Sequence, residues 1–242
     1  MNISFVIPVY KEEDNIIELI NKIDANCSSD KLNYKIFLID DSPTEIIKIK
    51  IKNLNHKVKY IYRGNKLGRG TAVLQGIEEV LNTIYTDIII EMDGDLSHDP
   101  DELNDKIEIF KINKLDMLIA SRYSKKSKIL NWPLSRKILS YISNSLAKFF
   151  LSIPITDYTN GFRFYSKESA IHITNNCGKI GDGFIVLSEI LMELYYNGFK
   201  ISEASTIFKN RKRGESNVDL KLIFNSFLGL FKLFFIKLKK YK

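Results

Sequence analysis

The chain has 242 residues, of which 45% are hydrophobic and 27% charged, a balance that is ordinary for a globular protein and excludes fibrous and disordered classes. This length can build one sizeable hydrophobic core and leaves little room for a second full domain. The net charge of +7 favours an anionic partner, which can be a nucleic acid, a phosphorylated substrate or an acidic membrane face. Because basic residues concentrate in 122–137 and 209–242, we expect this partner to bind to the second half of the chain.

The cysteines and the N-terminus indicate the compartment. Cys27 and Cys177 form no Cys-x-x-Cys motif and lie near no histidine cluster, so we expect free, buried thiols and neither a disulfide nor a zinc site. The chain opens directly into the apolar run Ile3–Ile7 without a basic leader, which predicts no secretion signal. A cytoplasmic location is the expectation that follows.

Short β-rich segments alternate with helical patterns in the first half of the chain. Strands are expected at Ile3–Val9, Tyr34–Asp40, Val58–Tyr62, Asp87–Met92 and Met117–Ala120. Several of them are apolar on both faces, as in the strands of a parallel sheet that helices cover. Helices are expected on the face marked by Ile16, Ile20 and Ile23, and near 70–83 and 100–113. The predicted fold is α/β, with an open, mixed or mostly parallel sheet flanked by helices.

The C-terminal segment 218–242 differs in pattern from the single domain expected over 1–217. Lys221, Asn225, Lys232 and Lys239 fall on one side of a helix, and Leu, Ile and Phe cover most of the rest. The charges interrupt the segment too often for a transmembrane span, which needs about 20 mostly apolar residues. Two interpretations of this amphipathic helix and its basic tail stay open: a helix in the membrane interface, and a helix that closes the domain.

Acidic residues follow two of the expected strands. Ligands of open α/β sheets bind beyond the carboxyl ends of the strands, so these positions are candidates for a site. Asp93 and Asp95, separated by Gly94, can chelate a hard cation such as Mg²⁺ or Mn²⁺, which prefers carboxylate and phosphate oxygens. A solvated Asp-Gly turn is the alternative interpretation.

Asp40 and Asp41 form a second carboxylate pair, at the end of the second strand. Two adjacent carboxylates repel each other without a cation or a donor, so we expect a bound partner such as a nucleobase or a ribose. A local role in the turn at Ser42-Pro43 is the alternative.

The segment 63–70 is rich in glycine and basic residues and precedes a helix, which makes it a candidate anion-binding loop. It matches neither the Walker A nor the dinucleotide-binding pattern. His98 is expected to be a turn residue and not a metal ligand.

Several blocks together resemble the dolichol-phosphate (polyprenyl-phosphate) mannosyltransferase branch of the GT-A fold, family 2 glycosyltransferases. The resemblance covers about residues 3–217. It depends on 6–12 (VIPVYKE), 40–43 (DDSP), 66–72 (KLGRGTA), 92–98 (MDGDLSH), 121–123 (SRY), 132–136, 157–163 (DYTNGFR) and 208–216. The chain departs from this branch in lacking a glycine after Asp40-Asp41 and a Gly-Gly after Arg122-Tyr123, and in carrying Asn217 where lysine is usual.

The resemblance implies roles for particular residues. The donor nucleotide would be held by Pro8, Tyr10, Glu12, Asp40, Asp41, Asp93, Gly94 and Asp95, and a Mg²⁺ or Mn²⁺ ion by Asp93, Asp95 and Ser97. The acceptor phosphate would meet Arg122, Ser135, Arg136 and Arg211, and the catalytic residues would be Asp95, Arg122 and Arg211.

The activity that this implies is inverting transfer of mannose from GDP-mannose to a polyprenyl or dolichyl phosphate at the cytoplasmic face of a membrane. A phosphate monoester is largely dianionic at neutral pH and attacks without a general base. The alternative is a UDP-sugar transferase that acts on undecaprenyl phosphate or on another glycan. A nucleic-acid-binding module explains the charge but not the acidic strand ends, so no nucleic-acid partner is expected.

Overall fold

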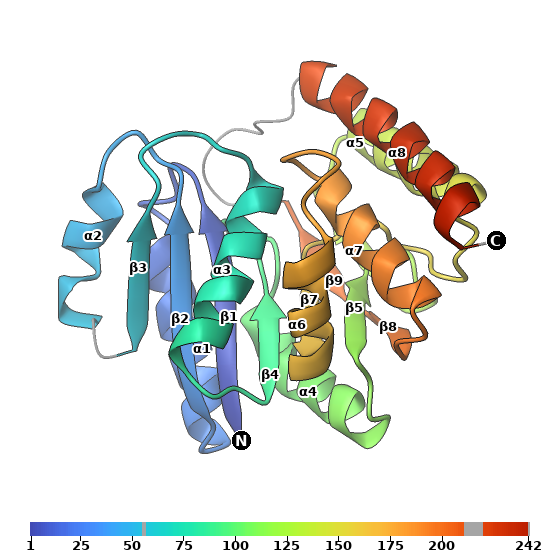
Figure 1. The fold of residues 1–242 in the computed structure, drawn as a ribbon. Helices are drawn as coiled ribbons and strands as arrows, with labels where there is room; N and C mark the ends of the chain where they lie inside the picture. The colour runs from blue at the N-terminus through green and yellow to red at the C-terminus, as the bar shows by residue number, and fades with distance from the viewer. Residues whose placement is uncertain (55–56, 211–219, 242) are drawn as a thin grey trace.

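The computed structural model of the protein describes residues 1–54, 57–210 and 220–241. Its centre is a seven-stranded sheet with the order β3-β2-β1-β4-β7-β5-β8 (Figure 1). All its strands are parallel except β7, which runs antiparallel to both of its neighbours. The strands are β1 (Asn2–Val9), β2 (Asn33–Asp40), β3 (Val58–Tyr62), β4 (Ile88–Glu91), β5 (Met117–Ser121), β7 (Arg163–Ser166) and β8 (Ile201–Ser205). A separate parallel pair is formed by β6 (Lys128–Leu130) and β9 (Ile207–Lys209).

Helices cover both faces of the large sheet (Figure 1). One core lies between the sheet and α1, α2 and α4, and a second lies between the sheet and α3, α5, α6, α7 and α8. Side chains of β1 alternate between the two cores, since Phe5 and Ile7 point into the first and Val6 into the second. The helices are α1 (Ile16–Ser29), α2 (Ile46–Lys50), α3 (Arg69–Thr83), α4 (Leu103–Ile112), α5 (Leu134–Leu151), α6 (Lys167–Asn176), α7 (Ile185–Tyr196) and α8 (Leu220–Lys240), with 3₁₀ turns at Lys52–Leu54 and Pro100–Glu102.

The predicted α/β fold with a mostly parallel sheet is confirmed. The five expected strands are β1 to β5, with bounds that agree within one or two residues, and the helix expected near 70–83 is α3. The helix expected near 100–113 begins as a 3₁₀ turn, where the Asp99 side chain accepts a hydrogen bond from the amide of Asp101, and continues as α4. The expected mixed sheet allowed for an antiparallel strand, but β7 itself was not predicted from the sequence.

The predicted C-terminal helix is present as α8 and packs against α5 and α7 (Figure 1). Leu230 and Leu233 are buried in this contact, and the end of the helix is held by Glu193 of α7, which accepts hydrogen bonds from Lys240 and Tyr241. Within the described part of the chain, no helix has the length and apolar character that crossing a membrane requires.

The strand order places a topological switch point between β1 and β4. From β1 the chain passes outward to β2 and β3, and β4 then returns to pair with the other edge of β1. Ligands of open α/β sheets bind in the crevice beyond the carboxyl ends of the two strands at such a point. Here those ends are followed by Tyr10–Glu12 and Asp93–Asp95.

Candidate functional site

The loops that follow β1 and β4 are in direct contact. A Cβ atom on Gly94 would lie 2.8 Å from Cγ1 of Val9 and 3.5 Å from Cγ of Glu12, so only glycine fits there without displacing its neighbours. The structure therefore brings together Glu12 and Gly94, which the sequence predicted to share one site. Pro8 and Tyr10 lie half-buried at the end of β1, where the Tyr10 ring is 4.6 Å from Nζ of Lys66 and 5.5 Å from Nζ of Lys11.

Both loops contain a residue in the left-handed region. Lys11 has a φ of 59° and Leu96 a φ of 62°, a conformation that non-glycine residues adopt at a cost and that clusters at functional sites. The turn around Leu96 is held by the buried Asp95, whose Oδ1 accepts a hydrogen bond from the amide of Ser97 at 3.0 Å. Asp95 and Ser97 are therefore joined in one tight turn, directly after Asp93 and Gly94.

Asp93 is fixed by an arginine to which the sequence analysis assigned no role. Nε and Nη2 of Arg69 donate to Oδ1 of Asp93 at 2.9 and 2.7 Å, and Nη1 donates to Glu91 at 2.8 Å. Glu91 is fully buried and also accepts a hydrogen bond from Tyr165. Gly161 makes room for this arginine, because a Cβ there would lie 1.8 Å from Nη2.

His98 holds the loop that contains Asp93 through a hydrogen bond to the backbone. Its Nδ1 accepts a hydrogen bond from the amide of Asp93 at 3.0 Å, so the neutral ring carries its proton on Nε2, which is 3.0 Å from Oδ1 of Asn160. The ring stacks on Phe162 at 5.1 Å and is completely buried. Both ring nitrogens of His98 are engaged within the protein.

The expectation that Asp40 and Asp41 need an external partner is wrong, because both carboxylates have protein donors. Asp41 forms a bidentate ion pair with Arg63, whose side chain is 4% exposed. Asp40 accepts hydrogen bonds from the hydroxyl of Tyr60 at 2.7 Å and from the amide of Ser42 at 2.8 Å. A role of this pair in nucleotide binding stays a prediction.

The glycine-rich segment 63–70 does bind an anion, but that anion is a side chain of the protein. The amides of Leu67 and Gly68 donate to Oδ2 of Asp41 at 3.0 and 3.1 Å. The amide of Gly70 donates instead to the carbonyl of Asp182 at 2.7 Å. Gly68 has a φ of 103° and allows this close contact. These amides already have acceptors within the protein, so the prediction that they bind an external anion is wrong.

Arg122 is buried and paired with Asp157, a residue on the loop before β7. Its Nε and Nη2 donate to the two carboxylate oxygens at 2.8 and 2.7 Å, and its amide donates to Oδ2 at 2.9 Å. Burial alone would raise the pKa of the Asp157 carboxyl, but the charge and hydrogen bonds of Arg122 outweigh burial and lower it. Burial lowers the pKa of Arg122, and the charges of Asp157 and, to a smaller extent, Asp93 reverse that and raise it.

Two arginines and two aromatic rings form an arginine–aromatic cluster: Arg122, Arg136, Trp132 and Phe208. The guanidinium carbon of Arg136 lies 4.1 Å from the centre of the Trp132 ring, and that of Arg122 lies 5.6 Å from it. Phe208 packs edge-on against Trp132 at 5.2 Å and against His98 at 5.4 Å. The cluster is thus joined through His98 to the loop of residues 93–98, which we call the acidic loop.

The Trp132 indole has a property of its own. Trp132 is only 7% exposed, and its buried Nε1 donates to no hydrogen-bond acceptor among the described residues. A buried donor without an acceptor costs free energy, so this site favours an incoming oxygen.

The remaining predicted acceptor residues lie near this cluster or outside the described residues. Ser135 is exposed in the first turn of α5, one residue before Arg136. Arg136 donates from Nη1 to Asn210 at 3.0 Å. Arg211, which the sequence predicts to be catalytic and to bind the acceptor phosphate, lies outside the described residues.

The oxygen donors of the acidic loop fit a hard divalent cation. Over residues 1–54, 57–210 and 220–241, no group of three or more His, Cys, Asp and Glu side chains is arranged to hold a metal ion by itself. Mg²⁺ and related ions are commonly held by one or two carboxylates together with substrate phosphates and water, and Asp93 and Asp95 can supply such a pair. Metal binding at this loop stays a prediction.

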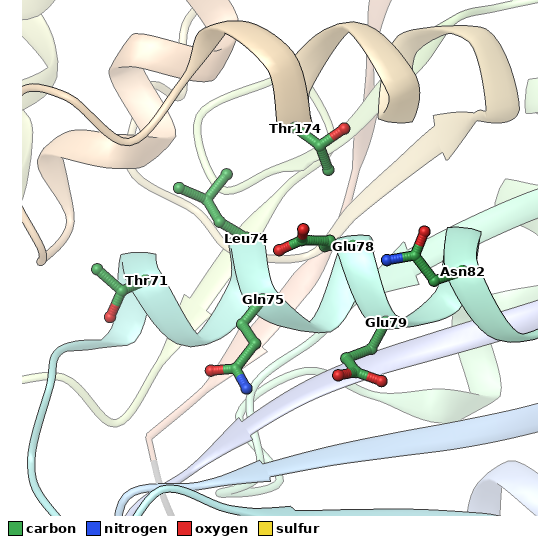
Figure 2. Close-up of a pocket in the computed structure, with 7 residues that line it drawn as sticks. All are labelled: Thr71, Leu74, Gln75, Glu78, Glu79, Asn82 and Thr174. Carbon is green, nitrogen blue, oxygen red and sulfur yellow. The ribbon is translucent and has the colours of Figure 1, made fainter.

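A surface hollow lies elsewhere, along α3 where it faces α6, and contains none of the predicted site residues (Figure 2). Its lining consists of Thr71, Leu74, Gln75, Glu78, Glu79, Asn82 and Thr174.

The supporting partners Arg69, Glu91, Asp157 and Asn160 were not predicted from the sequence. Arg69 lies 24 residues from Asp93, and Arg122 lies 35 residues from Asp157. No local pattern connects residues so far apart. The only signal was that Arg69, Asp157 and Asn160 fall inside blocks that carry the family resemblance.

An open α/β sheet with an acidic loop at its switch point defines the class: this is a GT-A fold. Glucosyl-3-phosphoglycerate synthase from Mycobacterium tuberculosis, solved in complex with UDP, superimposes with a TM-score of 0.67 at 15% identity, over 96% of this chain and 80% of that one. The chain belongs to glycosyl transferase family 2, whose family model matches residues 4–174. The expected fold and family are confirmed.

Two relatives in sequence are longer than the matched region. The chain is 34% identical over 239 residues to a dolichol-phosphate mannosyltransferase from Pyrococcus furiosus, a match that covers 96% of this chain and 64% of the relative. It is 28% identical over 217 residues to a polyprenol monophosphomannose synthase from Mycolicibacterium smegmatis, covering 88% of this chain and 79% of the relative. The chain thus spans somewhat less than two thirds of the length of the archaeal relative.

Proposed function

We propose that this protein transfers mannose from GDP-mannose to a polyprenyl or dolichyl phosphate and forms a β-linked lipid-phosphate mannose. The names of the two relatives support this reaction and substrate class. The observation that carries the proposal is the contact between the acidic loop and the arginine–aromatic cluster through Phe208. A donor diphosphate binds through a metal ion that carboxylates hold, whereas an acceptor phosphate binds directly to cationic side chains. This site offers carboxylates and arginines next to each other.

On the donor side, Asp93 and Asp95 would hold a Mg²⁺ or Mn²⁺ ion, and Ser97 lies in the same turn. Such an ion, when bound, neutralises the diphosphate and the charge that develops on the leaving nucleotide. Arg69 keeps Asp93 in place by binding one of its oxygens. The nucleotide would lie over the ends of β1 and β2, near Pro8, Tyr10, Glu12, Asp40 and Asp41.

On the acceptor side, the arginine–aromatic cluster would orient the lipid phosphate. Guanidinium groups match phosphate oxygens in pairs, and the buried Nε1 of Trp132 can donate to another oxygen. One phosphate oxygen attacks the anomeric carbon, and the bond from that carbon to the nucleoside diphosphate breaks, with its electron pair leaving on the nucleotide. No proton is transferred, since the phosphate monoester is already largely dianionic at pH 7. Attack from the face opposite the leaving group inverts an α-linked donor to a β-linked product.

A lipid acceptor places the reaction at a membrane, and we propose its cytoplasmic face, where nucleotide sugars are available. The carboxylates of the acidic loop would repel the phosphates of a nucleic acid, which argues against a nucleic-acid partner.

The experiment is a transfer assay with the purified protein, Mn²⁺, polyprenyl phosphate and a panel of GDP- and UDP-sugars, analysed by mass spectrometry. We expect a lipid-phosphate hexose with GDP-mannose, and a β configuration at the anomeric carbon by NMR. A product only with UDP-glucose or a UDP-amino sugar would instead support the alternative donor class. An α-linked product would contradict direct displacement.

A further inference from the structure

Asn160 is a buried residue whose polar groups all have partners within the protein. It is 2% exposed and lies on the loop between α5 and β7. Its side-chain oxygen lies 3.0 Å from Nε2 of His98, and its side-chain nitrogen donates to the carbonyl of Ala120 in β5. Its backbone amide donates to Oδ1 of Asp157 at 3.0 Å, and its carbonyl accepts a hydrogen bond from Arg163 at 2.8 Å. These four hydrogen bonds leave Asn160 little freedom to move.

Two of these contacts connect Asn160 to the two sides of the proposed site. On the donor side, His98 donates from Nε2 to Asn160 and accepts a hydrogen bond from the amide of Asp93 on Nδ1. On the acceptor side, Oδ1 of Asp157 accepts hydrogen bonds from the amide of Asn160 and from Nη2 of Arg122. A continuous series of hydrogen bonds, which we call the buried path, therefore runs from Asp93 through these three residues to Arg122.

The buried path is shielded from water. His98 and Asp157 are completely buried, and Arg122 is 8% exposed. In such an interior a hydrogen bond is stronger than in water, and a donor or acceptor that loses its partner is costly. A shift of one end of the buried path therefore breaks a buried hydrogen bond unless the other end follows.

The imidazole of His98 is suited to its place in the buried path. The ring is held between Phe162, on which it stacks at 5.1 Å, and Phe208, which meets it edge-on at 5.4 Å. Its acceptor and its donor lie on different corners of one rigid ring, so the two hydrogen bonds keep a fixed geometry. Because both nitrogens are used in this way, His98 acts through Asp93 and Asn160 and not on a substrate.

We infer that His98 and Asn160 are positioning residues, which set the separation of Asp93 on the donor side and Arg122 on the acceptor side. The inference rests on the proposed function, since it concerns how the two substrates of that reaction lie relative to each other. Direct displacement needs the attacking oxygen and the anomeric carbon in line, and a misplacement of about 1 Å can reduce the rate about a hundredfold. The buried path keeps the two binding sides in register.

Two variants each keep one half of the imidazole. The side-chain oxygen of His98→Asn can take the place of Nδ1, so this variant keeps the acceptor for the amide of Asp93 and loses the donor to Asn160. The side-chain nitrogen of His98→Gln can take the place of Nε2, so this variant keeps the donor and loses the acceptor. The matched control is His172→Asn on α6, whose ring contacts Glu193 and takes no part in the buried path. Circular dichroism and melting temperature show whether each variant is folded.

The two sides are measured separately. GDP-dependent binding of Mn²⁺, followed by electron paramagnetic resonance, reports on the donor side, and the KM for a short-chain polyprenyl phosphate reports on the acceptor side. We expect His98→Asn to raise this KM about tenfold and to keep Mn²⁺ binding within about twofold of the wild type. His98→Gln should weaken Mn²⁺ binding about tenfold and leave the KM within about twofold. The kcat should fall in both variants and stay unchanged in His172→Asn.

A purely structural role of His98 predicts a different result. Both variants would then weaken the donor side and the acceptor side to the same extent, in proportion to their loss of stability. That outcome, or an unchanged kcat in both folded variants, would overturn the positioning role.

A measurement on the wild type does not depend on the folding of any variant of His98. In protein labelled with ¹⁵N-histidine, the ring signals of His98 should shift when Mg²⁺ and GDP are added, and also when the short-chain polyprenyl phosphate is added alone. The signals of His172 should shift with neither ligand, and His172→Asn assigns them. A response of His98 to only one ligand, or to neither, would overturn the inference.

The transfer assay with the wild type separates this inference from the proposed function. A wild-type chain that transfers no sugar to polyprenyl phosphate would overturn the proposed function, and the positioning role with it. Transfer by the wild type, together with equal effects of His98→Asn and His98→Gln on the two sides, would overturn the positioning role alone.

Discussion

Arg69 binds Asp93 through a single carboxylate oxygen: its Nε and Nη2 both donate to Oδ1, at 2.9 and 2.7 Å. The third nitrogen of the same guanidinium donates to the buried Glu91. One side chain thus joins the end of β4 to the first carboxylate of the acidic loop. Arginine suits this position because its planar group presents two nitrogens to Asp93 and the third to Glu91 in a fixed geometry, whereas lysine carries its charge on a single nitrogen.

The first prediction concerns this bridge. Arg69→Gln leaves Glu91 as a buried charge without its cation, so we expect a loss of about 3–5 kcal/mol in the free energy of unfolding. Adding Glu91→Gln removes that charge and should restore a large part of the loss. Urea denaturation of the wild type, both single variants and the double variant measures the coupling. Strictly additive losses would show that the two residues do not act as a pair.

The second prediction separates the structural role of Asp95 from its proposed role in catalysis. Asp95→Asn keeps an oxygen that can accept the hydrogen bond from the amide of Ser97, and it removes the negative charge. We expect a folded protein with a melting temperature within a few degrees of the wild type and a kcat that is lower by about a hundredfold or more. Asp95→Ala should lose both the turn and the activity. Wild-type turnover in Asp95→Asn would limit this residue to a turn role.

The buried strands and the acidic loop could be predicted from the sequence, but the partner of Asp41 and the strand β7 could not. Continuous apolar runs such as Ile88–Ile90 identified the buried strands, and the spacing of Asp93 and Asp95 identified the acidic loop. The sequence could not reveal that Asp41 already has Arg63 as a partner, because this contact depends on β3 being the neighbour of β2 in the sheet. The antiparallel insertion of β7 between β4 and β5 was also beyond reach, since a four-residue strand carries no information about its direction.

The third prediction follows from the lowered pKa of Asp157. A carboxyl whose pKa is lower in the folded than in the unfolded protein stabilises the fold above its ordinary pKa of 3.8, and this stabilisation is lost as the pH falls through the folded value. The wild type should therefore be more stable than Asp157→Asn at pH 7, and the difference should shrink as the pH falls below about 4. Chemical denaturation at several pH values measures it. A difference that is independent of pH would contradict an ionised Asp157 in the folded protein.

The fourth prediction concerns the buried indole nitrogen of Trp132. Trp132→Phe keeps an aromatic ring under Arg136 and removes the Nε1 donor. One hydrogen bond to a charged acceptor contributes about 1.5–3 kcal/mol, so the KM for polyprenyl phosphate should rise by roughly tenfold or more. The KM for the nucleotide sugar should stay the same. Steady-state kinetics with each substrate varied in turn measures both constants, with Lys111→Ala of α4 as a distant control.

An equal rise of both KM values in Trp132→Phe would mean that the ring supports the whole site and not the acceptor in particular. An unchanged KM for the acceptor would place the lipid phosphate away from Trp132.

The proposed function requires that the acidic loop and a donor diphosphate bind one divalent cation between them. Electron paramagnetic resonance of Mn²⁺ tests it directly, because bound and free Mn²⁺ give different signal intensities. We predict that the wild-type chain binds Mn²⁺ much more tightly with GDP than without it, and that Asp93→Asn abolishes this gain while its circular dichroism is unchanged. Equal GDP-dependent binding by Asp93→Asn and the wild type, or no effect of any nucleoside diphosphate, would contradict a shared cation at the acidic loop.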